Sequence, residues 1–223
     1  NCAMNREEYE AFMKEVGNAY RDIKALLDDK PLIEHYVDTA FRTEFFHTDP
    51  DTPLRYNGTQ LIVRHVICSY LRQLLTIDKR RTPFKYIESE KKIREVYPIN
   101  SHGTQLDVLL GGTIDRIDSK VNESGREVTR ILDYKTGGSL KKLSSIDELF
   151  LRDKPRDGYV FQAFYYSYLM SHEYSFIAPS LLFVRKTSDE NFEINSSLCF
   201  PSCFKASSIC IICYNNRFFP YCI

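Results

Sequence analysis

The stretch LDVLLGGTIDRIDSKVNESGREVTRILDYKTGG, residues 106–138, decides the fold. Its two outer parts have the apolar content and short length of β-strands, and the polar segment VNESGRE between them contains a glycine that suits a hairpin turn. A hairpin brings two strands side by side, so polar residues at matching positions lie close together. The stretch therefore predicts a β-hairpin that carries a polar site.

Three ionisable residues of this hairpin form the predicted site: Asp115 on the first strand, and Asp133 and Lys135 on the second. Side chains alternate between the two faces of a strand, so Asp133 and Lys135 share one face. Two carboxylates supply the hard oxygen ligands that Mg²⁺ or Mn²⁺ prefers. A protonated lysine cannot bind the cation, but it can orient an attacking water and stabilise charge on a phosphate.

A structural role for the same residues is the alternative. Asp115 and Asp133 would then be strand-end residues that form ordinary ion pairs. The cations within reach would be Arg116, Arg130 and Lys135. The chemical interpretation is favoured because Asp and Lys are poor strand formers that here follow an apolar pair, and because the hairpin places a second carboxylate opposite.

The order of motifs resembles the PD-(D/E)XK nuclease superfamily, in its RecB/AddB-like branch. GGTIDRID is similar to the G-x-x-D strand of that branch, ILDYKTG to its D-Y-K strand, and FQAFYYSYL to its Q-x-x-x-Y helix. The resemblance covers roughly residues 84–186. It implies an α/β fold with a restriction-endonuclease-like core, in which helices flank a mixed central sheet. It also implies hydrolysis of phosphodiester bonds in DNA with Mg²⁺ or Mn²⁺.

The resemblance also implies a role for each matching position of the hairpin. Asp115 and Asp133 would be metal ligands, and the backbone carbonyl of Tyr134 would be an additional one. Lys135 would position or activate the water. By the same resemblance the protein would be an exonuclease-type module of a recombination or repair helicase–nuclease, with DNA and a helicase or other domains of its parent protein as partners.

Four further residues are placed around this site. Gln162 and Tyr166 share one helix face and, by the resemblance, would lie beside the active site and hold it or the DNA. Glu90 is an outer carboxylate or a solvated strand residue, and the second interpretation is favoured. Asp118 alternates to the face opposite Asp115 and is expected to be structural.

One departure from the branch concerns an upstream histidine, which usually follows a glycine on a helix and completes the metal site. None of the upstream histidines has that context; they are His35, His47, His65 and His102. His65 lies on an apolar helical stripe, which favours a core or groove residue. We expect that the chain is a piece of a longer protein and that the histidine preceded residue 1. A nuclease-fold module that no longer cuts, and only binds DNA or partner subunits, is therefore the alternative function.

Changes in apolar periodicity divide the chain into three zones. Residues 1–83 are expected to form a helical region packed on the core, residues 84–187 the nuclease core, and residues 188–223 an irregular tail rich in Cys, Ser and Phe. A helix over about residues 59–77 is expected to bury one stripe of side chains, namely Leu61, Ile62, His65, Val66, Tyr70, Leu74 and Leu75.

Composition narrows the function classes. Lys and Arg together number 30, as do Asp and Glu, so the surface as a whole does not attract nucleic acid. A local groove remains open, because Arg80, Arg81, Lys91 and Lys92 could line a path for DNA or simply form a solvated charged face. No apolar run approaches the roughly 20 residues that span a bilayer, so no membrane partner is expected.

The seven cysteines do not form a secreted disulfide framework, because five of them follow residue 198. A reducing, cytoplasmic setting is expected. Cys210, Cys213 and Cys222, with Cys2 far upstream, loosely resemble the [4Fe–4S] pattern of some relatives of the branch. The spacing to Cys222 is too long for that pattern, so a cluster is not expected.

Overall fold

The computed structural model describes residues 4–49, 51–101, 103–137, 158–186, 193–195 and 198–199. The chain divides into two compact units. Glu10–Pro83 forms a helical unit, and the described residues of Asn1–Tyr9 and Phe84–Ile223 form a sheet unit.

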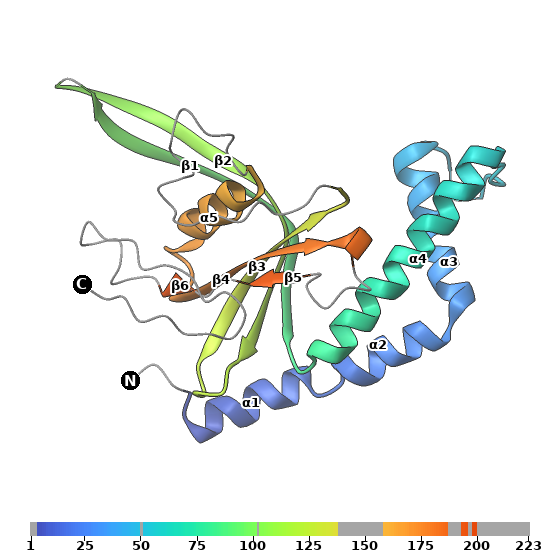
Figure 1. The fold of residues 1–223 in the computed structure, drawn as a ribbon, viewed down its shortest axis with the longest axis horizontal. Helices are drawn as coiled ribbons and strands as arrows, with labels where there is room; N and C mark the ends of the chain where they lie inside the picture. The colour runs from blue at the N-terminus through green and yellow to red at the C-terminus, as the bar shows by residue number, and fades with distance from the viewer. Residues whose placement is uncertain are drawn as a thin grey trace. The chain divides into compact units, whose positions relative to one another are not determined.

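The sheet unit is built on one mixed sheet with the strand order β1-β2-β3-β4-β5, in which β6 also pairs with β4 (Figure 1). Antiparallel pairing joins β1 to β2 and β2 to β3, whereas β3 and β4 are parallel. Helix α5 connects these two parallel strands. The strands are β1 (Lys85–Ser101), β2 (Thr104–Val121), β3 (Glu127–Lys135), β4 (Phe176–Phe183), β5 (Glu193–Asn195) and β6 (Leu198–Cys199), with α5 at Gly158–Met170 and a short 3-10 helix at Val184–Lys186. The predicted fold class is confirmed.

Strands β5 and β6 fall inside residues 188–223, where the sequence suggested irregular structure. Both pair antiparallel with β4, so sheet pairing continues past residue 187. Cys2, Cys210, Cys213 and Cys222 lie outside the described residues.

The turn between β2 and β3 closes the predicted hairpin. The backbone N–H of Asn122 donates to Arg126 O at 2.8 Å, and that of Gly125 donates to Asn122 O at 3.0 Å. The Asn122 side-chain oxygen also accepts from the backbone N–H of Ser124 and of Arg126. Gly125 has a φ of 72°, a conformation that glycine adopts without the steric cost of a Cβ.

Helix α5 packs against one face of the sheet. Its Tyr166 and Met170 form an apolar cluster with Ile117 of β2, Ile131 of β3 and Ile177 of β4. All five side chains are buried. Each contributes on the order of 1.5–3 kcal/mol relative to exposure. This face of β3 also carries Asp133 and Lys135, so core packing fixes the helix over the predicted site.

The helical unit consists of the end of α1 (Arg6–Val16), α2 (Ala19–Asp28), α3 (Lys30–Ala40), a π-helical turn (Phe41–Phe45) and α4 (Gly58–Arg81). The start of α4 is fixed by a capping box, in which the Asn57 and Gln60 side chains accept from each other's backbone N–H groups at 2.9 and 2.8 Å. None of the described helices has the length and apolar content to cross a membrane.

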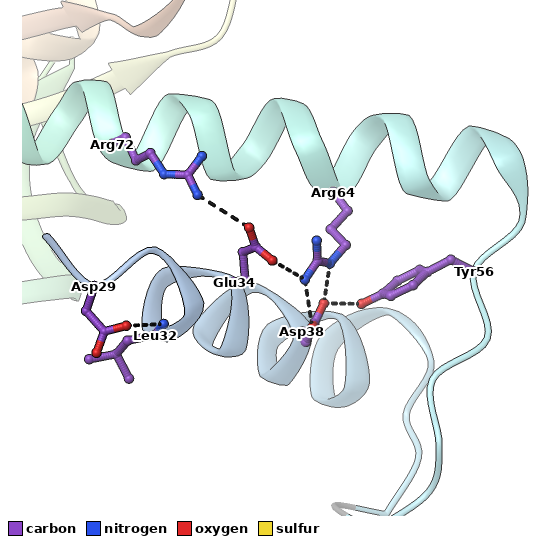
Figure 2. A network of polar contacts seen from close by, with 7 residues as sticks. All are labelled: Asp29, Leu32, Glu34, Asp38, Tyr56, Arg64 and Arg72. Atoms are coloured by element: carbon purple, nitrogen blue, oxygen red, sulfur yellow. Dashed lines mark hydrogen bonds and ion pairs between the residues drawn. The ribbon is translucent and has the colours of Figure 1, made fainter. Parts of the chain in front are cut away.

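Figure 2 shows the polar network that joins α3 to α4. The Arg64 guanidinium donates to both carboxylate oxygens of Asp38, at 2.5 and 2.9 Å, and lies 3.4 Å from Glu34. The Tyr56 hydroxyl donates to Asp38 at 2.7 Å. The hydrogen bonds from Arg64 lower the pKa of Asp38, while burial and the bond to Asp38 raise the pKa of Tyr56 to about 12. Arg72 pairs with Glu34 at 3.5 Å.

The buried stripe predicted for α4 is wrong at four of its positions. Leu61 and Ile62 are 52% and 66% exposed, and His65 and Val66 are also exposed. The fully buried residues of α4 are Cys68 and Ile77. The first half of α4 has apolar residues around much of its circumference, so periodicity does not identify the covered face. The ion pairs of Arg64 and the packing of Cys68 against α3 fix that face instead.

Candidate active site on the β2–β3 hairpin

The end of β3 brings Asp133 and Lys135 together as expected. Asp133 Oδ2 lies 2.5 Å from Lys135 Nζ, and Asp133 is only 4% exposed. The two residues follow Ile131, whose side chain packs under α5, and alternation places all three on that face of the strand. The pair therefore lies on the face of the sheet against which α5 packs.

The carboxylate of Asp133 is poorly satisfied for a buried charge. Its Oδ2 atom is buried and, despite the nearby ammonium, has no hydrogen bond of good geometry. Burial raises the pKa of Asp133, Lys135 opposes that rise, and the neighbouring Asp115 charge adds to it. The Lys135 ammonium compensates one charge, whereas the carboxylates of Asp115 and Asp133 together carry two, so this pair of carboxylates favours a further cation.

Asp115 is held against β3 by a main-chain contact. Its Oδ2 atom accepts a hydrogen bond of 2.7 Å from the backbone N–H of Tyr134. The ladder pairs Arg116 with Leu132, so the next residues along the two strands are the two acids. The structure thus brings Asp115, Asp133 and Lys135 together. The use of the Tyr134 carbonyl as a ligand stays a prediction.

Residues of helix α5 also contact Lys135. Lys135 Nζ donates to Gln162 Oε1 at 2.8 Å, and Gln162 Nε2 donates to the Tyr166 hydroxyl at 3.1 Å. The ammonium also lies 4.7 Å from the centre of the Tyr159 ring, within cation–π range. Gln162 and Tyr166 therefore lie beside the predicted site. The sequence did not indicate the contact of Tyr159.

Two glycines of β2 fit the aromatic residues of α5. A Cβ at Gly112 would lie 2.6 Å from Cε1 and 2.7 Å from the hydroxyl of Tyr166, so only glycine fits there. Gly111 N–H donates to the Tyr165 hydroxyl at 2.8 Å, and that hydroxyl lies 3.3 Å from Gly111 O. Glycine inside a strand often marks such a close approach, so Gly111 and Gly112 are the signal in the sequence that points to this contact.

Asp118 lies on the opposite face of the hairpin and is 1% exposed. Arg130 donates to both of its oxygens, through Nε at 2.7 Å and through Nη2. Arg116 Nη2 lies 2.9 Å from Asp118 Oδ2. The arginines that a purely structural interpretation would assign to Asp115 or Asp133 therefore pair with Asp118. This agrees with the structural role expected for Asp118.

Glu90 lies on β1 between Ser89, which pairs with Arg116, and Lys91, which pairs with Ile114. It is therefore level with Asp115 on the neighbouring strand. Its side chain is exposed and its φ is 53°. A part for Glu90 in the site stays a prediction.

The four basic residues proposed to contact DNA belong to different units. Lys91 and Lys92 are on β1, where Lys91 pairs with Glu173 at 2.6 Å and Lys92 is exposed. Arg80 and Arg81 end α4 of the helical unit. A shared DNA groove therefore stays a prediction.

The upstream histidines have no assigned part in the site. His35, His47 and His65 are exposed residues of the helical unit, and His102 lies outside the described residues. The core position considered for His65 is therefore wrong.

The carboxylates of the site are the groups that could hold a divalent cation. In the described parts of the chain, no group of three or more His, Cys, Asp and Glu side chains is arranged to hold a metal. Mg²⁺, however, is commonly bound through one or two carboxylates and completes its shell with water and substrate oxygens. Asp115 and Asp133 supply that set, and a cation there would offset the repulsion between the two neighbouring carboxylates, so the residues fit the ion.

Comparison with known families agrees with this geometry. The family model described as the PD-(D/E)XK nuclease superfamily matches residues 10–195. The chain belongs to the PD-(D/E)XK nuclease superfamily. The match includes the helical unit, so the superfamily domain extends further toward the N-terminus than the resemblance over residues 84–186 indicated. No curated protein and no solved structure gives a significant match.

Proposed function

We propose that this PD-(D/E)XK protein is a divalent-metal-dependent DNA nuclease of exonuclease type. The observation that carries the proposal is the grouping at the end of β3. There the buried Asp133 carboxylate has the Lys135 ammonium at 2.5 Å and a second carboxylate, that of Asp115, as a neighbour. Such an arrangement is costly for folding and is explained by chemistry at the site.

A setting in a cytoplasmic recombination or repair helicase–nuclease is part of the proposal. It is supported by the RecB/AddB-like order of motifs and by the contact of the Q-x-x-x-Y helix with Lys135. DNA and a helicase or other domains of the same parent protein would be the partners.

Each residue has a distinct task in the proposed reaction. Asp115 and Asp133, with the Tyr134 carbonyl, would hold the cation. A bound divalent cation supplies positive charge at the phosphate and lowers the pKa of water. Lys135 Nζ donates a hydrogen bond to the attacking water or to a phosphate oxygen, where negative charge grows in the transition state.

Gln162 keeps Lys135 in place for this task. Its Oε1 accepts from the ammonium while its Nε2 is fixed by the Tyr166 hydroxyl, so the lysine approaches the substrate from a defined direction. Preorganised donors of this kind stabilise developing charge without reorganisation during the reaction. Tyr159 adds a ring that covers one side of the ammonium.

The alternative is a nuclease-fold module that binds DNA or partner subunits without cutting. The observation that favours it is that only two carboxylates meet at the described site, with no third side chain of the kinds that bind metal. Retention of both aspartates together with the lysine favours cleavage, because a module that only binds DNA has no need of two carboxylates beside its lysine.

The two functions are separated by incubating the chain with end-labelled linear single- and double-stranded DNA and Mg²⁺ or Mn²⁺. We expect progressive shortening that a chelator stops. Asp115→Asn and Asp133→Asn should abolish shortening and, in calorimetry, Mn²⁺ binding. Asp107→Asn is the matched control, because Asp107 is an exposed carboxylate of the same β2 strand. DNA binding without cleavage would favour the alternative, and Mn²⁺ binding unchanged by both substitutions would contradict the metal site.

A further inference from the structure

Phe161 is the exception among the aromatic residues of α5. It is 43% exposed, whereas Tyr166 at the next turn is 6% exposed and packs in the core. Phe161 immediately precedes Gln162, whose side chain contacts Lys135. An exposed ring therefore lies one residue from the group that holds the proposed catalytic lysine.

A second aromatic ring supports Phe161. The rings of Phe161 and Tyr165 are nearly parallel, with an angle of 8° between their planes and 6.3 Å between their centres. Tyr165 is fixed in turn, because its hydroxyl bonds to the main chain of Gly111 on β2. The two residues, here called the aromatic shelf, thus present a ring whose orientation is set before any ligand binds.

We propose that the aromatic shelf stacks a nucleobase of single-stranded DNA beside the phosphate that is cut. This inference rests on the proposed function, and it names the form of DNA that the site accepts. Aromatic side chains bind unpaired bases by stacking, with little dependence on base identity. In a duplex the faces of the bases are covered by their neighbours, so the shelf can act only on single strands or on ends that have opened.

The position of the shelf makes a nucleobase a better occupant than an apolar peptide. Polar groups adjoin it: Gln162, which follows Phe161 in the chain and bonds to Lys135, and the main chain of Gly111, which bonds to Tyr165. A nucleotide satisfies both kinds of surface, because its phosphate suits the ammonium and its base suits the ring. An apolar peptide has no group that could make use of the ammonium and the main-chain groups so close to the ring.

Binding is measured by fluorescence anisotropy in an Asp133→Asn background, so that the DNA stays intact. The two probes are a labelled oligothymidylate and an abasic oligonucleotide of the same length. We expect Phe161→Ala to weaken oligothymidylate binding about tenfold, in line with the loss of one stacked base. The same substitution should leave binding of the abasic probe unchanged, because that probe has no base to stack.

Variants that keep or remove the ring separate stacking from folding. Phe161→Tyr should bind within about twofold of the parent, because the ring remains. Tyr36→Ala is the matched control, since Tyr36 is a similarly exposed aromatic residue on α3 of the helical unit. The thermal midpoint of each variant checks that it is folded. If Phe161→Ala does not fold, Phe161→Leu, which keeps an apolar side chain but has no ring, takes its place and should show the same base-dependent loss.

Three results would overturn the shelf: equal binding of the two probes by the parent, an equal loss on both probes in Phe161→Ala, or an equal loss in Tyr36→Ala. None of these readouts depends on cleavage. A chain that fails to cut DNA but shows the base-dependent loss would contradict the proposed nuclease and leave the shelf standing. A chain that cuts DNA but shows no base-dependent loss of binding in Phe161→Ala would contradict the shelf and leave the proposed nuclease standing.

Discussion

Asp118 and Asp133 are both buried aspartates of the same hairpin, at 1% and 4% exposure, yet their surroundings differ. Asp118 is paired on both oxygens by Arg130 and also contacts Arg116. Asp133 has one cation beside it, the Lys135 ammonium at 2.5 Å from Oδ2, and that contact does not have the geometry of a good hydrogen bond.

The difference separates two uses of a buried carboxylate. A carboxylate that is paired on every side holds two strands together and has no capacity left for a ligand. A carboxylate that is buried but incompletely paired is costly on its own and becomes favourable when a cation joins it. Burial therefore does not distinguish the functional acid from the structural one, but the completeness of its partners does.

Among these variants, Asp118→Ala is expected to lower the unfolding free energy the most. Removing the carboxylate takes the Asp118 charge away from two buried arginine side chains, which costs about 3–5 kcal/mol of unfolding free energy. Urea unfolding followed by circular dichroism measures the loss. Cleavage per folded molecule should remain near that of the parent. A loss of unfolding free energy below about 1 kcal/mol, the value for a surface ion pair, would contradict the structural role given to Asp118.

Lys135→Ala tests the catalytic role proposed for the residues around Asp133. The rate of DNA cleavage should fall about 10²–10³-fold, the usual effect of removing a donor to developing transition-state charge. The matched control is Lys120→Ala, which removes an exposed lysine from β2 and should leave the rate unchanged. Initial rates with saturating DNA give the comparison. An unchanged rate in Lys135→Ala would remove the lysine from the mechanism.

Gly112→Ala tests the close contact between Gly112 of β2 and Tyr166 of α5, which holds α5 beside the site. The added methyl group meets the Tyr166 ring at 2.6 Å, so we expect a loss of about 1–3 kcal/mol from overpacking. Displacement of Tyr166 should also disturb Gln162 and lower the cleavage rate of the folded fraction. Gly158→Ala is the control, since a Cβ there meets nothing within 4 Å. Equal stability of the two variants would show that Tyr166 moves aside at no cost.

The smallest change in stability is expected at Asp38, a third aspartate, whose side chain is less buried than those of Asp118 and Asp133. Its carboxylate is 29% exposed, so its pair with Arg64 is partly screened and contributes about 1 kcal/mol. Its pKa is lowered by the Arg64 hydrogen bonds from an ordinary value of 3.8. The stabilisation is therefore present above pH 3.8 and is lost as the pH falls through the lowered pKa.

Thermal midpoints at neutral and acidic pH, for the parent and for Asp38→Asn, measure this contribution. The variant should be less stable than the parent at neutral pH, and the difference should shrink in acid. A difference that stays constant with pH would show that the carboxylate charge does not contribute.

Local pattern was sufficient for the elements that form the site. Alternation predicted that Asp133 and Lys135 share a face, and the VNESGRE turn predicted that Asp115 comes beside them. What the sequence could not give is the set of partners that lie across strands or on another element. Examples are the pairing of Arg116 and Arg130 with Asp118, and the fit of Tyr166 over Gly112, because both depend on register and helix placement.

The prediction for α4 failed for a related reason. Periodicity identifies a helix, but a helix with apolar residues on several faces needs its neighbours to decide which face is covered. In the helical unit, the ion pair between Asp38 of α3 and Arg64 of α4 fixes the covered face, and these two residues are distant in sequence.

The bond between Tyr165 and Gly111 also has a consequence for self-association. In an antiparallel ladder, the N–H and C=O of one residue point together either to the partner strand or away from it. Gly111 pairs with Arg94 of β1 and gives its N–H to Tyr165, so these groups point to the edge of β2 that faces away from β1. The described ladder of β3 on that edge ends at Arg116, so it does not reach Gly111. An open strand edge is where another chain can add a strand and begin an aggregate. By occupying the main chain at Gly111, the tyrosine that supports the aromatic shelf also interrupts that edge.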